Sequence, residues 1–94
     1  MMILEKSIEK NLKNKVEQLG GKCLKWICPQ VSGAPDRLVL YKGKVYFVEL
    51  KRDAKSNITI LQVLFGKWLI NNGFDYSILM SNYDVEHFIE RITK

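Results

Sequence analysis

The chain has 94 residues, and fifteen Lys and Arg against ten Asp and Glu give it a formal net charge of +5. This length predicts one domain, residues 1–94, with a modest core, and the charge suits a polyanionic partner without identifying one. No run approaches the roughly 18 uninterrupted apolar residues of a membrane span, and the first residues do not resemble a secretory signal. We therefore expect a cytoplasmic protein with no membrane partner.

Apolar residues at helical spacing predict a first helix over residues 3–19. The series is Leu4, Ile8, Leu12, Val16 and Leu19, and the pair Gly20-Gly21 ends it. Glu5 projects inside the arc of these side chains, where an unpaired carboxylate is costly. Two interpretations stay open for Glu5: a first-turn residue favoured by the helix dipole, or a residue of a functional site.

Residues 22–28 indicate a short strand. Its expected packing residues are Cys23, Leu24, Trp26 and Ile27. Cys23 and Cys28 lack the further ligands of a zinc site, and a disulfide is not expected inside a cell, so both should pack. In the loop that follows, Gly33 permits a close backbone approach and Pro35 stiffens the entry to the next strand.

Two apolar runs on either side of Lys42-Gly43 predict a β-hairpin. With a two-residue turn, Asp36 falls opposite Glu49, and like charges about 4.5–5.5 Å apart destabilise a sheet unless something such as a divalent cation joins them. Lys51 shares the strand face of Glu49. Singly, Asp36 could be a turn residue and Glu49 with Lys51 a solvated ion pair. However, the apolar neighbours of Glu49 predict burial, where a carboxylate must be paired, protonated or metal-bound.

The second half of the chain predicts a loop, a helix, a strand and a final helix. Arg52 and Lys55, in the polar loop, are either phosphate contacts or solvated bases. The helix should run from residue 59 or 60 to 72 and end at Gly73. Its expected buried stripe is Leu61, Leu64, Phe65, Trp68 and Leu69. Gln62 lies beside that stripe, where a lone glutamine usually faces solvent.

A strand over residues 74–80 and a helix that begins near Ser81 complete the chain. The apolar residues of this helix are Val85, Phe88, Ile89 and Ile92, and His87 is expected at the surface. The order α-β-β-β-α-β-α predicts an α/β fold with a central mixed sheet.

The segments SGAPD at residues 32–36 and ELK at residues 49–51 match the PD…ExK pattern of the PD-(D/E)xK nuclease superfamily. Together with Gln62, they make the chain resemble the virus-type replication-repair nuclease (VRR-NUC) branch over nearly its whole length. The resemblance implies a restriction-endonuclease-like core, a mixed β-sheet flanked by helices, with the C-terminal helix as an addition or a flank. Archaeal-type Holliday junction resolvases share a similar layout, so the subfamily stays open.

The resemblance also implies the roles of individual residues. The implied active site consists of Glu5, Asp36, Glu49, Lys51 and Gln62. Asp36 and Glu49 would bind Mg²⁺, or Mn²⁺ in its place, with Glu5 (directly or through water) and the main-chain carbonyl of Leu50 as further ligands. Lys51 would orient or deprotonate the attacking water or stabilise the transition state, and Gln62 would position Lys51 or the water. The expected DNA contacts are Ser32, Gly33, Arg52 and Lys55.

The expected activity is that of a divalent-metal-dependent DNA endonuclease that leaves a 5′-phosphate and a 3′-hydroxyl. We expect a homodimer selective for branched DNA such as Holliday junctions, within a viral or cellular replication or DNA repair complex. The last helix or the hairpin edge, residues 38–46, would form the dimer contact. The alternatives are a non-catalytic DNA- or partner-binding module on a nuclease fold, a basic scaffold or anti-host protein, and a nicking subunit of a larger complex.

Overall fold

The computed structural model describes residues 4–51 and 58–94, except for the side chains of residues 4 and 5. The elements are α1 (Leu4–Gln18), β1 (Lys22–Lys25), β2 (Arg37–Tyr41), β3 (Lys44–Leu50), α2 (Ile60–Asn71), β4 (Asp75–Leu79) and α3 (Asn82–Ile92). This order confirms the α/β fold and the succession of elements predicted from the sequence. None of the helices in the described ranges combines the length and apolarity that crossing a membrane requires.

The four strands form one mixed sheet in the order β1-β2-β3-β4. The first three strands are antiparallel, and β4 runs parallel to β3. Lys42 and Gly43 form the predicted two-residue turn, both with positive φ, as expected for the turn that suits a hairpin's twist. The pairing then runs from Tyr41↔Lys44 to Arg37↔Val48. Asp36 comes one residue before β2, which brings it beside Glu49 as the predicted register requires.

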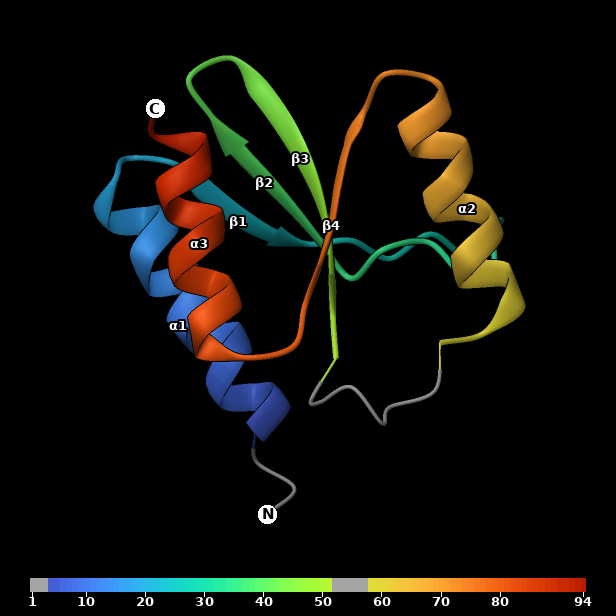
Figure 1. The fold of residues 1–94 in the computed structure, drawn as a ribbon, viewed down its shortest axis with the longest axis horizontal. Helices are drawn as coiled ribbons and strands as arrows, with labels where there is room; N and C mark the ends of the chain where they lie inside the picture. The colour runs from blue at the N-terminus through green and yellow to red at the C-terminus, as the bar shows by residue number, and fades with distance from the viewer. Residues whose placement is uncertain (1–3, 52–57) are drawn as a thin grey trace.

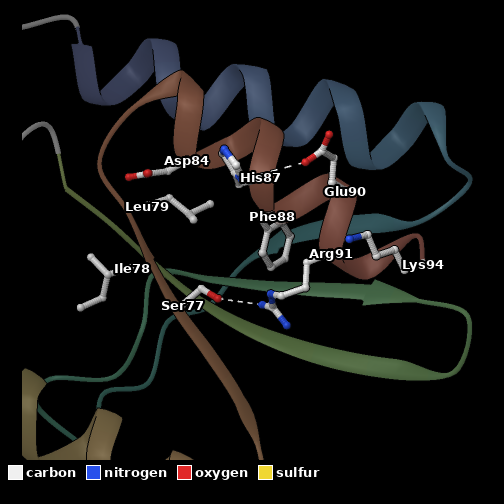
Figure 2. A pocket seen from close by; sticks show the side chains of 9 residues that line it. All are labelled: Ser77, Ile78, Leu79, Asp84, His87, Phe88, Glu90, Arg91 and Lys94. Atoms are coloured by element: carbon white, nitrogen blue, oxygen red, sulfur yellow. Dashed lines mark hydrogen bonds and ion pairs between the residues drawn. The ribbon is translucent and has the colours of Figure 1, made fainter.

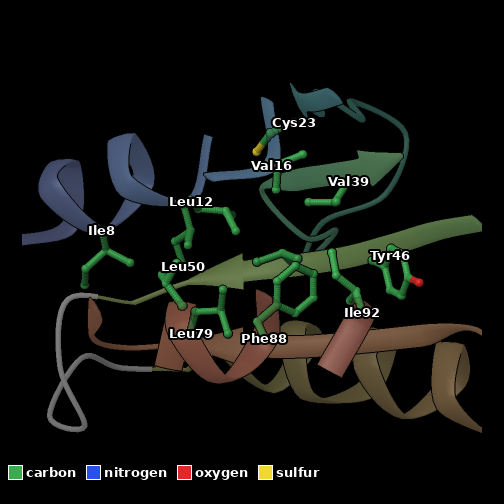
Figure 3. Close-up of a cluster of buried hydrophobic side chains, with 12 residues drawn as sticks. Ile8, Leu12, Val16, Cys23, Val39, Tyr46, Leu50, Leu79, Phe88 and Ile92 are labelled. Carbon is green, nitrogen blue, oxygen red and sulfur yellow. The ribbon is translucent and has the colours of Figure 1, made fainter. Parts of the chain in front are cut away.

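Helices α1 and α3 lie together on one face of the sheet, and α2 lies apart from them (Figure 1). Alternation along β3 separates the two environments, because Val48 and Leu50 face α1 and α3, whereas Glu49 faces α2. The residues that form the buried core are Ile8, Leu12, Val16, Cys23, Val39, Tyr46, Val48, Leu50, Leu79, Val85, Phe88 and Ile92 (Figure 3).

Strand β1 is shorter than the sequence indicated. It ends at Lys25 instead of Cys28, and both Leu24 and Ile27 are exposed, contrary to the prediction that they pack. Strand β1 lies at one edge of the sheet, whereas α2 packs on β4 at the opposite edge. Among the described residues, no helix packs over Leu24 as α2 packs over β4. Trp26 packs as predicted, with its ring centroid 5.5 Å from that of Phe47.

The buried stripe predicted for α2 is correct at Leu69, which is buried, and in part at Phe65, which is half-buried against Trp26; it is wrong at the other three residues. Only Gly66 and Leu69 are buried in this helix, whereas Leu61, Leu64 and Trp68 are 50%, 57% and 54% exposed. Nearly every side of α2 is apolar, so its sequence does not mark the side that faces the sheet. Contact with a single edge strand then leaves most of the helix uncovered.

The last helix flanks the sheet, one of the two predicted possibilities, and contributes to the core. Val85, Phe88 and Ile92 of α3 are all buried, and α3 packs against α1. The dimer contacts predicted on the last helix and the hairpin edge stay predictions. Tyr83 of α3 is 70% exposed, and the hairpin strands β2 and β3 both have a neighbouring strand on each side.

Candidate active site

Asp36 is fixed by backbone contacts on two sides. Its main-chain oxygen accepts a hydrogen bond from the Trp26 N–H at 2.9 Å, and its Oδ2 accepts one from the Leu50 N–H at 2.9 Å. Pro35, directly before it, is fully buried. The loop thus holds the Asp36 carboxylate against the end of β3, beside the next residue of the motif.

Glu49 is a buried acid, only 2% exposed. Its Oε2 accepts a hydrogen bond from Gln62 Nε2 at 2.8 Å and lies 3.4 Å from Lys51 Nζ. Within the described part of the chain, its Oε1 has no hydrogen-bond partner. Burial and, after it, the charge of Asp36 raise the pKa of Glu49 to about 7, although the charge of Lys51 opposes the shift. The ionised form therefore lacks a full set of compensating contacts.

Gln62 connects α2 to the acidic pair. Its Oε1 accepts hydrogen bonds from Lys51 Nζ and from the Thr59 N–H, both at 3.0 Å. Its own N–H donates to Thr59 Oγ1 at 3.1 Å, which completes a capping box at the start of α2. These contacts set the amide orientation, so Nε2 points to Glu49. The sequence Thr59-x-x-Gln62 carried this signal, although we predicted the role of Gln62 only from the family resemblance.

The acidic pair fits a hard divalent cation. Both carboxylates only accept hydrogen bonds when ionised, they lie close together, and Glu49 has an oxygen with no donor. A cation at this position would offset the charge repulsion and occupy that oxygen. No third His, Cys, Asp or Glu joins the pair in the ranges that the structure describes. The side chain of Glu5, predicted as a further ligand, lies outside what the structure describes.

The remaining predicted residues have different positions. Gly33 has a φ of +89°, and a Cβ there would come within 2.5 Å of the Leu61 carbonyl carbon, so this glycine lets the loop touch the start of α2. Ser32 lies next to it and is exposed. Arg52 and Lys55 fall outside the described residues.

Two residues near the site were not predicted. Arg37, next to Asp36, donates two hydrogen bonds to Glu9 Oε2, which ties β2 to α1. Tyr76 lies on the α2 side of β4, where burial and, to a smaller extent, the charges of Glu49 and Asp36 together raise its pKa to about 12. Its ring occupies the space that the missing side chain of Gly66 leaves. Strand alternation across the pair Phe47↔Tyr76 could have indicated this position.

A cavity of about 510 Å³ lies between β4 and α3 (Figure 2). Its main charged groups already have partners: Arg91 donates to Asp75 and Ser77, and Asp84 accepts from the Met80 N–H. None of the acidic pair, Lys51 or Gln62 lines it. These contacts indicate a joint between helix α3 and strand β4, separate from the acidic pair.

A known structure shares the fold of this chain. No protein-family model matches the sequence. A solved structure described as a VRR_NUC domain superposes with a TM-score of 0.84 at 32% identity, over 92% of this chain and 94% of that one. The chain belongs to the VRR-NUC family. This result confirms the predicted family, and the mixed sheet with flanking helices is the VRR-NUC fold.

A curated phage protein is also similar to this VRR-NUC chain. It is named "Putative nuclease p44" and comes from Acyrthosiphon pisum secondary endosymbiont phage 1. The two are 49% identical over 51 residues, which are 53% of this chain and 55% of the relative. The matched region thus spans about half the length of that protein.

Proposed function

We propose that this VRR-NUC protein is a divalent-metal-dependent DNA endonuclease of the PD-(D/E)xK type. One observation carries the proposal: the Glu49 carboxyl is buried beside Asp36 and Lys51 with one oxygen that lacks a donor among the described residues. Membership of a nuclease family and the similarity to p44 support the same conclusion. The alternative, a non-catalytic DNA- or partner-binding module, gives no reason for a buried glutamate beside a second carboxylate.

Asp36 and Glu49 would hold Mg²⁺ or Mn²⁺, with the Leu50 main-chain carbonyl and Glu5 as the further ligands. When bound, such an ion supplies Lewis-acid activation of the phosphate and of the attacking water. The Leu50 N–H bond to Asp36 keeps one carboxylate in place, and the Gln62 amide keeps the other.

Lys51 would orient the attacking water and stabilise negative charge on the phosphate. Its side chain is 13% exposed, and its Nζ lies between Gln62 Oε1 and Glu49 Oε2. This position directs the amino group to the space beside the acidic pair. The role is electrostatic, a type of contribution that is commonly worth about 10²–10³ in rate.

The net charge of +5 supports DNA as the substrate. The proposed contacts are Ser32, Gly33, Arg52 and Lys55. A domain of this size has little room for a separate recognition module, so we propose selection by shape, with branched DNA such as a Holliday junction preferred. A homodimer would present two active sites for paired incisions. The setting would be intracellular DNA replication or repair, and the similarity to p44 favours a phage context.

A cleavage assay tests the proposal. Labelled four-way junction, flap, single-stranded and linear duplex DNA are incubated with Mg²⁺, Mn²⁺ or EDTA. Wild type should cut only with metal and prefer the junction, and Asp36→Asn and Lys51→Met should be slower by about 10²-fold or more. Glu17→Gln, an exposed control on α1, should match wild type. Cutting in EDTA, or equal cutting by Asp36→Asn, would refute the proposal.

A further inference from the structure

A polar pocket of about 380 Å³ lies between α1 and the start of α3. Its lining residues are Ser7, Lys10, Asn11, Asn14 and Asn82. The four residues from α1 have the spacing i, i+3, i+4, i+7, so they form one stripe about 10 Å long on that helix. Each of the five side chains can donate a hydrogen bond, and none of these lining residues is a carboxylate.

The two asparagines of this stripe are unfavourable for α1 itself. Asparagine is among the weaker helix formers, and Asn11 and Asn14 both lie in the interior of α1. Asn14 is exposed, so packing does not offset its cost. Asn11 Nδ2 donates to Asn82 Oδ1 at 3.0 Å, which joins the two helices. Because this bond uses the Asn82 oxygen, the Asn82 amide NH₂ group is left as a donor for a ligand in the pocket.

The charge of the pocket is positive. Nearby acids are already paired: Glu9 accepts hydrogen bonds from Arg37, and Glu86 of α3 lies 2.9 Å from Lys15 Nζ. In contrast, none of the ion pairs between described residues includes Lys10, which is exposed. A set of donors around one lysine fits an anionic ligand.

We propose that this pocket, which we call the α1–α3 pocket, binds the phosphate backbone of the DNA substrate beside the active site. The inference rests on the proposed function for the identity of the ligand. Lysine, serine and asparagine are residue types that contact phosphates, and such contacts position DNA without reading its sequence. A stripe about 10 Å long spans two or three phosphates of one strand. A protein partner, in contrast, would need apolar anchors, and the lining residues offer none.

The α1–α3 pocket lies close to the active site. Helices α1 and α3 begin at the end of the sheet where β3 and β4 end (Figure 1). There the Lys51 N–H donates to the Leu79 carbonyl at 3.0 Å, and Asn82 follows Leu79 by three residues, a span of at most about 11 Å. A DNA strand at Lys51 therefore comes within reach of the pocket.

The pocket and the proposed contact at Gly33 lie on opposite sides of the sheet. Gly33 touches the start of α2, and Glu49 faces α2 as well, whereas the pocket lies on the side of α1 and α3. DNA that crosses the end of the sheet would be held on both sides of the acidic pair. The pocket would thus add affinity and orientation, and it would take no part in the chemical step.

Fluorescence anisotropy of a labelled four-way junction in EDTA tests the pocket without the metal or turnover. The pocket variants are Lys10→Gln and Asn14→Ala. The matched control is Lys13→Gln, which makes the same charge change on the same helix, because Lys13 pairs with Glu17 and does not line the pocket. All three side chains are exposed, so the variants should fold, and Asn14→Ala should raise the unfolding temperature.

Lys10→Gln should weaken junction binding about 10-fold and reduce the slope of log affinity against log salt by about 1. Asn14→Ala should weaken binding about 5-fold and leave the slope unchanged, since it removes no charge. Lys13→Gln should bind like wild type. In cleavage with Mg²⁺, both pocket variants should raise KM and keep kcat, because the contact is the same in the ground state and the transition state.

Three results would overturn the proposal: pocket variants that bind the junction like wild type, equal losses in Lys10→Gln and Lys13→Gln, or a wild type that binds no DNA. Its failure is distinguishable from failure of the proposed function. Weaker junction binding by the pocket variants, with no cleavage by wild type, would refute the nuclease and leave the pocket intact. Metal-dependent cleavage with binding and KM unchanged in the pocket variants would do the reverse.

Discussion

The two faces of the sheet differ in how completely they are closed. On the α1 and α3 face, Leu12, Val39, Val48 and Val85 are fully buried and the packing is apolar. On the side of the sheet that faces α2, the buried Glu49 lies beside Lys51 and Gln62. Helix α2 covers this side but leaves most of its own apolar side chains exposed. Strand β3 contributes to both faces, with Val48 and Glu49 as neighbours in sequence.

This difference indicates that the two faces of the sheet have different roles. The closed face supplies the stability of the fold, and the open face holds groups that are costly to bury but useful in chemistry. A carboxylate in an unfavourable environment persists because the rest of the domain fixes its position. Changes on the two faces should therefore have opposite consequences for stability and activity.

The largest expected effect on stability is at Glu49. In EDTA, which keeps the site free of metal, the pKa of Glu49 in the folded protein is raised to about 7 from its ordinary value of 4.5. Because the folded pKa is the higher one, this group's contribution to stability is complete below about pH 4.5 and is lost as the pH rises through about 7. Urea unfolding should show a loss on the order of 3 kcal/mol for wild type between pH 4.5 and 8.

Glu49→Gln should lack that decline in stability and should also lack cleavage activity. The exposed variant Glu17→Gln should retain the decline. An unfolding free energy of Glu49→Gln that falls as steeply with pH as that of wild type would show that Glu49 is not the strained group.

Next in size is a matched pair on β3, Val48→Ala and Val45→Ala. Val48 is fully buried on the closed face and Val45 is 45% exposed on the other. Truncation should lower the free energy of unfolding by about 2 kcal/mol at Val48, since it removes two carbons and leaves a cavity, and by less than about 0.5 kcal/mol at Val45. Equal losses in urea unfolding would contradict the distinction between the faces.

The smallest expected effect separates backbone strain from steric contact on the open face. Gly33 and Gly20 both have a φ of +89°, but an added Cβ meets the backbone of α2 at Gly33 and nothing within 4 Å at Gly20. Gly20→Ala should cost about 1 kcal/mol from conformation alone, and Gly33→Ala about 1 kcal/mol more, together with slower cleavage. Thermal unfolding of both variants measures this, and identical costs would argue against a role of Gly33 in seating α2.

The sequence predicted the closed face and the hairpin well, because local rules determine them. The turn at Lys42-Gly43 fixed the register, and the register placed Asp36 beside Glu49. Helical spacing identified Ile8, Leu12 and Val16 as core.

The open face was harder to predict. The predicted burial of Leu61, Leu64 and Trp68 was wrong. When every side of a helix is apolar, its sequence does not show which side faces the sheet, and only tertiary contacts decide which side chains are covered. Arg37 and Tyr76 were missed for a related reason, since each depends on an element far away in the sequence. The catalytic, metal-binding and DNA-binding roles of the predicted site residues all stay predictions, including those of Glu5, Arg52, Lys55 and the Leu50 carbonyl.

The central claim is that Asp36 and Glu49 together bind a divalent cation. Isothermal titration calorimetry with Mn²⁺, on metal-free wild type and on Asp36→Asn, Glu49→Gln and the control Asp75→Asn, tests it without any need for turnover. Asp75 pairs with Arg91 away from the site. Wild type and the control should bind Mn²⁺, and both site variants should lose Mn²⁺ binding. Equal Mn²⁺ binding by all four proteins would contradict it.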